Sequence, residues 1–132
     1  MPPVLHLKID LDTHVGTRQG IPNLLSLLDK HKAQATCFVS LGPDNSGKAI
    51  WRIFRRRGFL AKMLRTNAPG MYGMKTMMYG TLLPAPLIGR TCLAELKQIT
   101  AAGHELGLHA WDHVGWHDHL DHWNDAEAAA EY

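Results

Sequence analysis

The sequence predicts an α/β fold with parallel strands, and three observations carry that prediction. Residues 4–9 and 35–41 are apolar, rich in branched side chains and bounded by turn-forming residues, which is typical of strands. Residues 21–32 lie between them and have helical spacing of their leucines. A helical pattern at 91–102 precedes a further strand-like segment at 104–109. Strands joined through a helix in this way are parallel, and their functional residues collect at their C-terminal ends.

Composition places the chain among ordinary globular proteins. The 132 residues suffice for one domain with a core, and 45% hydrophobic with 20% charged residues is typical of a folded protein. The formal net charge of +2 hides a strong asymmetry. Residues 45–94 contain nine Lys/Arg and no acidic residue, whereas residues 104–132 contain seven Asp/Glu and no Lys or Arg. The sequence therefore predicts two surfaces of opposite charge.

Compartment is indicated by the start of the chain and by its cysteines. The first residues lack the basic and apolar regions of a signal peptide, and no apolar run approaches the ~20 residues of a membrane span. Cys37 and Cys92 lie far apart, without C-x-x-C spacing. We expect two reduced, buried thiols in a cytoplasmic protein.

The first strand-like segment leads directly into two carboxylates. Asp10 and Asp12 stand at its C-terminal end, and residues two apart on a strand point to the same face. Considered alone, the pair could also be a solvated turn with an Asp cap. Residues 14–20 are expected to form a loop, and Pro22 suits the first turn of the helix at 21–32.

Residues 43–90 interrupt the alternation as a basic amphipathic insertion after the second strand. Between residues 48 and 65, cationic side chains alternate with apolar ones, and the group includes Trp51, Arg52, Arg55, Arg56 and Arg57. A cationic face beside an apolar one suits anionic lipid headgroups or a phosphorylated substrate at a membrane surface. A pair of ordinary surface helices explains the pattern equally well. Nucleic acid is disfavoured, because no base-reading motif accompanies the local charge.

A histidine pair follows the third strand-like segment. His109 and His113 have H-x-x-x-H spacing at a C-terminal strand end, as Asp10 and Asp12 do. Two imidazoles with a distant carboxylate, here Asp10 or Asp12, can form a three-ligand metal site with an open position. Such a donor set suits zinc, cobalt, manganese or iron. The remaining histidines of this tract are expected to be structural or solvent-exposed: His104, His117, His119 and His122.

These segments together resemble the polysaccharide deacetylase (NodB-homology) family of deformed (β/α) barrels. The motifs that carry the resemblance are Ile9-Asp10-Leu11-Asp12-Thr13, Phe38-Val39-Ser40, and Gly103-His104-Glu105-Leu106-Gly107-Leu108-His109 through His113. The resemblance implies that Asp12, His109 and His113 bind one divalent metal ion and that Asp10 is the general base. It also implies that residues 1–132 form the first strands and helices of such a barrel, as a single, partial domain.

Within the family, the chain is most similar to the deformylase branch. Gly16-Thr17-Arg18, Gly42-Pro43-Asp44-Asn45 and Trp51-Arg52 carry this narrower likeness. It implies removal of the formyl group from undecaprenyl-phosphate-linked 4-deoxy-4-formamido-L-arabinose, at the cytoplasmic face of the inner membrane. The pathway would be lipid A modification, which confers resistance to polymyxin and other cationic peptides.

Departures from the family pattern define the alternatives. Ala110 and Thr13 replace residues usual in the broad family, and the later family motifs, an arginine that orients the base and a distal histidine, do not follow. We therefore expect the N-terminal portion of an enzyme, with weak metal binding and little turnover. The alternatives are a deacetylase of another N-acylated sugar and a non-catalytic, metal-binding protein of the membrane surface.

Overall fold

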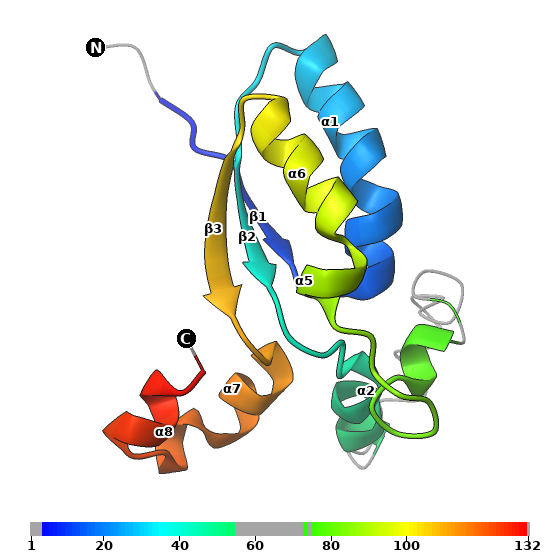
Figure 1. The fold of residues 1–132 in the computed structure, drawn as a ribbon, viewed down its shortest axis with the longest axis vertical. Coiled ribbons are helices and arrows are strands. Elements are labelled where there is room, and N and C mark those ends of the chain that lie inside the picture. Colours follow the sequence, from blue (N-terminus) through cyan, green and yellow to red (C-terminus); the bar gives the residue numbers. More distant parts are fainter. Residues whose placement is uncertain (1–3, 55–72, 74, 132) are drawn as a thin grey trace.

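The fold is a three-stranded parallel sheet covered by helices on one face (Figure 1). The computed structural model describes residues 4–54, 73 and 75–131, with the backbone alone at 51–54. Strands β1 (Lys8–Leu11), β2 (Thr36–Ser40) and β3 (Glu105–Ala110) lie side by side in this order. Both pairings are parallel, so the expected α/β architecture is confirmed.

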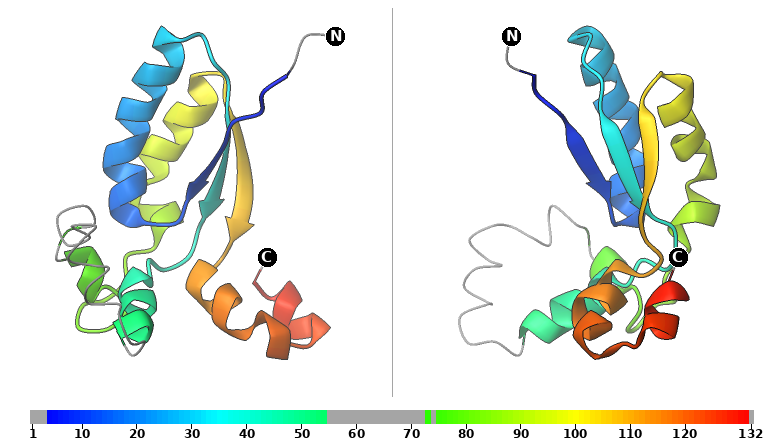
Figure 2. Two further views of the ribbon diagram at one scale, coloured as in Figure 1. Left: turned by 180° about the vertical axis from the view of Figure 1, so that it is seen from behind. Right: turned by 90° about the vertical axis from the view of Figure 1, so that its left-hand side faces the viewer.

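Helix α1 (Ile21–Lys30) connects β1 to β2 and begins where the sequence predicts. Pro22 occupies its first turn, where no backbone N–H is needed. The helix packs beside α6 (Leu93–Ala101), and both cover the same face of the sheet (Figure 2). Among the described residues no helix covers the other face, which carries Asp10 and Phe38 of neighbouring strands.

The core lies between the sheet and these two helices. Leu11 and Val39 are partners across β1 and β2 and are both buried, as expected for one face of a pleated sheet. Side chains of the helices pack against this face of the sheet. The other buried members of the cluster are Ile21, Cys37, Ile88, Cys92, Leu96 and Ile99. Both cysteines are free and fully buried, as predicted. Burial raises the pKa of each thiol, which keeps it protonated and unreactive.

Three predicted boundaries are wrong. Strand β1 begins at Lys8 rather than at residue 4, because Lys8 pairs with Thr36, the first residue of β2. Val4 and Leu5, which precede β1, are exposed. The predicted loop at 14–20 is helical and ends in a π-helix, Gly16–Gly20, that continues into α1. Thr13 caps this segment, because its Oγ1 accepts a hydrogen bond from the Gly16 N–H at 3.0 Å.

The third boundary lies in the predicted helix at 91–102. It is split into α5 (Ile88–Thr91) and α6, because the backbone at Cys92 leaves the helical conformation. The predicted end at Gly103 is correct: this residue has a φ of +82°, which glycine adopts without strain. Beyond β3 follow α7 (His113–His119), a 3₁₀ turn (Leu120–His122) and α8 (Asp125–Ala129).

The predicted insertion begins with α2 (Ser46–Phe54). Pro43, at the start of the insertion, forms an antiparallel bridge with Leu87, near the end of the insertion. The chain therefore leaves and re-enters the fold at one place. The predicted basic and apolar faces lie mostly outside the described residues. Within the described part of the chain, no helix is long and apolar enough to cross a membrane.

Candidate metal centre

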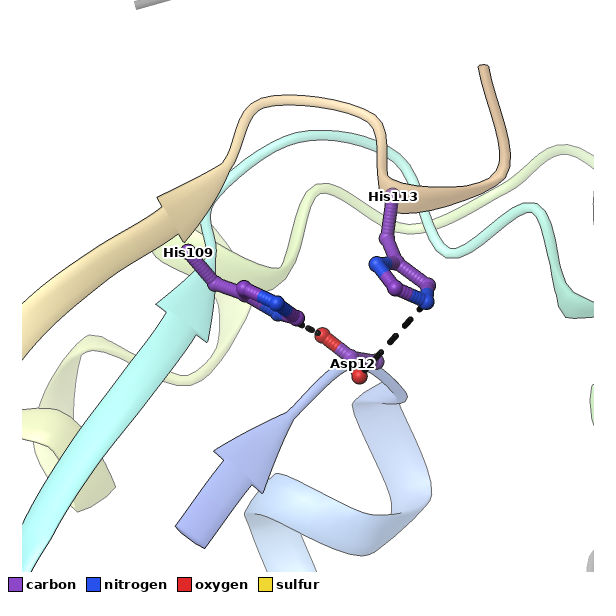
Figure 3. Close-up of side chains that lie close together, drawn as sticks. All are labelled: Asp12, His109 and His113. Atoms are coloured by element: carbon purple, nitrogen blue, oxygen red, sulfur yellow. Dashed lines mark hydrogen bonds and ion pairs between the residues drawn. The ribbon is translucent and has the colours of Figure 1, made fainter. Parts of the chain in front are cut away.

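Three side chains from three separate segments converge at the C-terminal edge of the sheet (Figure 3). Asp12 follows the last residue of β1, and His109 is the penultimate residue of β3. His113 is the first residue of α7, directly after the turn that leaves β3. Because the strands are parallel, both of their C-terminal ends lie at one edge, and this brings residues almost a hundred positions apart into contact.

Asp12 is the centre of this cluster. Its Oδ1 atom lies 2.9 Å from His109 Nδ1, and its Oδ2 atom lies 4.0 Å from His113 Nε2. Ser40, at the end of β2, donates a hydrogen bond from Oγ to Asp12 Oδ1 at 2.7 Å. The middle strand therefore orients the carboxylate between the two imidazoles.

The donor set fits a divalent metal ion. One ligand atom from each residue lies within 4.8 Å of the other two. Around a tetrahedral zinc ion, neighbouring ligand atoms are roughly 3.3 Å apart, given metal–ligand bonds of about 2.0–2.2 Å. The distances of 2.9 and 4.0 Å from Asp12 to the imidazoles bracket this spacing. Small rotations of these side chains would suffice to bind an ion.

Partial burial also suits this role. The side chains of Asp12, His109 and His113 are 26%, 24% and 39% exposed, so a ligand can reach them from solvent. The two imidazole rings stack, with centroids 4.9 Å apart and planes 29° apart. Stacking restricts both rings, which reduces the conformational entropy lost when an ion binds.

Asp10, the predicted base, lies outside this ligand group. Lys8 Nζ forms an ion pair with Asp10 Oδ1 at 2.9 Å, and both side chains are partly exposed. Asp10 and Asp12 nevertheless line one small hollow, together with residues of the β1–α1 connection. The structure thus places the two carboxylates near one another and gives Asp10 a cationic partner that the sequence analysis did not identify.

A second hollow, of about 410 Å³, opens directly beside the imidazoles. It is lined by His109, Ala110, His113, Trp116, His117, Leu120 and Asp121. His117 stands one helical turn after His113, and their ring centroids are 6.1 Å apart. His117 was expected to be structural or solvent-exposed; it is exposed, and it lies beside the site. His104, with the same expectation, is half-buried at the opposite end of β3.

Sequence reasoning missed the residue that sets the start of α7. Asp112 is its N-cap, and its Oδ1 atom accepts hydrogen bonds from the N–H groups of Val114 and Gly115, both at 3.1 Å. Its own N–H donates to Glu131 Oε2 at 3.1 Å. An Asp immediately before a helix is a recognisable N-cap signal, and this signal could have identified Asp112.

The predicted surface residues of the insertion cannot be placed in the site. Trp51 and Arg52 belong to α2, whose side chains there are not described, and Arg55, Arg56 and Arg57 lie outside the described residues. Their contact with a substrate or a membrane stays a prediction.

Comparison with known proteins shows the family of the chain. The sequence profile of the polysaccharide deacetylase family matches residues 4–132, nearly the whole chain. This chain belongs to the polysaccharide deacetylase family. The family name denotes removal of an acetyl group from a polysaccharide, and Asp12, His109 and His113 converge within the matched residues.

Two curated proteins are similar to most of this chain. A probable 4-deoxy-4-formamido-L-arabinose-phosphoundecaprenol deformylase from Shewanella sediminis (strain HAW-EB3) is 46% identical over 125 residues, 95% of this chain and 41% of that protein. A protein with the same description from Wigglesworthia glossinidia brevipalpis is 42% identical over 102 residues, 77% of this chain and 35% of that protein. The chain therefore spans about two fifths of the length of these relatives.

Proposed function

We propose that this chain carries the metal-binding part of a deformylase. Its substrate would be undecaprenyl-phosphate-linked 4-deoxy-4-formamido-L-arabinose, and its pathway the modification of lipid A that gives resistance to polymyxin. The convergence of Asp12, His109 and His113 carries the proposal, because this donor set has the composition of a catalytic metal site with an open position. The similarity to the two deformylases supports this choice of substrate.

A bound divalent ion would supply Lewis-acid polarisation of the formamide carbonyl and a more acidic water. Asp12, His109 and His113 would hold that ion, and Ser40 would keep Asp12 oriented through its 2.7 Å hydrogen bond. Asp10 would accept the proton of the attacking water. Lys8, which pairs with Asp10 at 2.9 Å, would hold that carboxylate in position. Cleavage of the carbon–nitrogen bond releases formate and leaves a free amine on the sugar.

The hollow beside the imidazoles is the place for the sugar. Trp116 lines it, and sugars commonly pack their apolar faces on aromatic rings. His117 and Asp121 line the same hollow and can exchange hydrogen bonds with hydroxyl groups. The phosphate and lipid would extend from the open side of the hollow, at the cytoplasmic surface of the inner membrane.

Turnover by these 132 residues alone should be low. The distal histidine that would protonate the leaving amine, according to the resemblance, has no counterpart in the sequence after His122. Metal binding does not need that group. Binding is therefore the stronger test of the site, and turnover is the test of the substrate.

The first experiment measures both properties on the purified chain. Titration with Zn²⁺, Co²⁺, Mn²⁺ and Fe²⁺ should show one ion per chain, and His113→Ala or Asp12→Asn should abolish that binding. Asp29→Asn is the matched control, because Asp29 is an exposed carboxylate on α1 that forms an ion pair with Lys32. Undiminished binding in both site variants would contradict the proposed metal centre.

The second experiment separates the substrates. Formate release from the synthetic formamido sugar lipid should exceed the Asp12→Asn background, while the matching acetamido compound should give no acetate. Acetate release in preference to formate would favour a deacetylase of another N-acylated sugar. Stoichiometric metal binding with neither product would favour a non-catalytic protein.

A further inference from the structure

Two adjacent buried residues in the turn after β2 each hold one of the segments that carry the metal ligands. Asp44 is 0% exposed and Asn45 is 5% exposed, which is unusual for polar residues in a connecting turn. Both have hydrogen-bond partners that are distant in sequence. One partner follows β1 and the other follows β3.

Asp44 holds the segment after β1. Its Oδ2 atom accepts a hydrogen bond from the backbone N–H of His14 at 2.8 Å, two residues beyond the ligand Asp12. Its Oδ1 atom accepts from the N–H and hydroxyl of Ser46 at the start of α2. The carboxylate thus ties the β1–α1 connection to the turn after β2.

Asn45 holds the segment after β3. Its Nδ2 atom donates to Asp112 Oδ2 at 2.7 Å, while the other oxygen of Asp112 caps the helix that begins at His113. A Cβ atom on Gly80 would lie 2.4 Å from Asn45 Oδ1, so the Gly80 backbone packs closely against this amide. The close contact leaves Asn45 little freedom to turn its donor away from Asp112.

We infer that Asp44 and Asn45 are positioning residues that set the separation of Asp12 from His113. These two ligands come from segments with no direct backbone pairing, since β1 pairs with β2 and β2 with β3. The turn after β2 is the element bonded to both segments. This inference rests on the metal centre proposed above, because it assigns the geometry of that centre to a turn that binds no metal itself.

The hydrogen bond between Asn45 and Asp112 allows a sharp test, because donor and acceptor can be exchanged. Asn45→Asp places two carboxylates where the 2.7 Å bond now is, and Asp112→Asn places two amides there. The double variant Asn45→Asp/Asp112→Asn restores one donor and one acceptor. Asn is as good an N-cap as Asp, so α7 keeps its cap in the double variant.

Co²⁺ affinity and the visible absorption spectrum of the Co²⁺-bound chain are the measurements. Loss of a supporting partner of a metal ligand typically costs about 10–100-fold in affinity. We expect each single variant to bind Co²⁺ at least tenfold more weakly, with an altered ligand-field spectrum. The double variant should regain affinity to within about threefold of the parent, together with the parent spectrum. Asn23→Asp, the same change on the exposed surface of α1, should change neither.

Each outcome decides a separate question. Single variants that bind Co²⁺ with the parent affinity and spectrum would overturn the inference, as would a double variant no better than the singles. A parent chain that fails to bind Co²⁺ would overturn the proposed metal centre itself, and the inference with it. If Asn45→Asp does not fold, as judged by circular dichroism, Asn45→Ser takes its place, because it shortens the donor without adding charge. Parent affinity and spectrum in Asn45→Ser would then overturn the inference.

Discussion

Ser40 and Asp12 are joined by a 2.7 Å hydrogen bond that links the middle strand to the centre of the site. The bond ends on Asp12 Oδ1, the same oxygen that lies 2.9 Å from His109. A hydroxyl donor on one ligand oxygen fixes the plane of the carboxylate, and so fixes the direction in which Asp12 can face an ion. Ser40 ends the segment Phe38-Val39-Ser40, one of those that carry the resemblance to the family, and this contact gives that serine a physical role.

We expect Ser40→Ala to weaken metal binding by about tenfold, the lower end of what supporting hydrogen bonds contribute. The carboxylate would keep its position on the chain but lose the donor that orients it. Isothermal titration with Zn²⁺ measures the change. Ser26→Ala, an exposed serine on α1, is the matched control and should bind zinc as the parent does. Equal affinity in both variants would show that Ser40 has no part in the site.

The sheet and the convergence of the candidate ligands could be predicted from the sequence because both follow from local patterns. Apolar runs identified the strands, and the rule for parallel strands placed Asp12 and His109 at one edge. The supporting contacts could not be predicted in this way. Ser40 and Asp12 are 28 residues apart, and Asn45 and Asp112 are 67 residues apart. Neither contact therefore produces a periodic pattern in the sequence.

Local chemistry also explains the error at 14–20. Two glycines in a short polar stretch predicted a loop, yet Thr13 supplies the cap that lets a helix begin. Thr17, fully buried, adds a second bond from its hydroxyl to the Thr13 carbonyl at 2.9 Å. Such capping by threonine outweighs the low helix propensity of glycine.

The two buried thiols give a prediction about pH. Burial raises the pKa of Cys37 and of Cys92 above the ordinary value of 9.0, so both stay protonated at pH 8 in the folded chain. A thiol-specific disulfide reagent should therefore react slowly with the native protein and rapidly in denaturant. Because the folded-state pKa is the higher one, stability should be unaffected below pH 9 and fall as pH rises toward the raised values. Rapid labelling of both thiols in the native protein would contradict their burial.

Two glycines form a matched pair for testing the end of α6. Gly103 has a φ of +82°, whereas Gly20 has a φ of −76° within the helical segment, and a Cβ atom at either position would meet no neighbour within 4 Å. Gly103→Ala should lower the free energy of unfolding by about 1–2 kcal/mol, the strain of a left-handed alanine. Gly20→Ala should raise it by about 0.5–1 kcal/mol. Urea unfolding measures both, and equal effects would show that the backbone at Gly103 does not carry the strain.

The cationic insertion gives the prediction that connects the chain to a membrane. Each Lys or Arg near an anionic bilayer contributes about 1 kcal/mol to binding, so replacing Arg55, Arg56 and Arg57 with serine should reduce partitioning by about a hundredfold. Cosedimentation with vesicles containing phosphatidylglycerol measures the effect at low ionic strength. Replacement of Lys30, Lys32 and Lys97 removes the same charge from exposed positions on α1, the turn after it, and α6. A similar loss in both triple variants would show that net charge alone attracts the chain, whereas a loss confined to the arginines would place the insertion at the membrane beside the lipid-linked substrate.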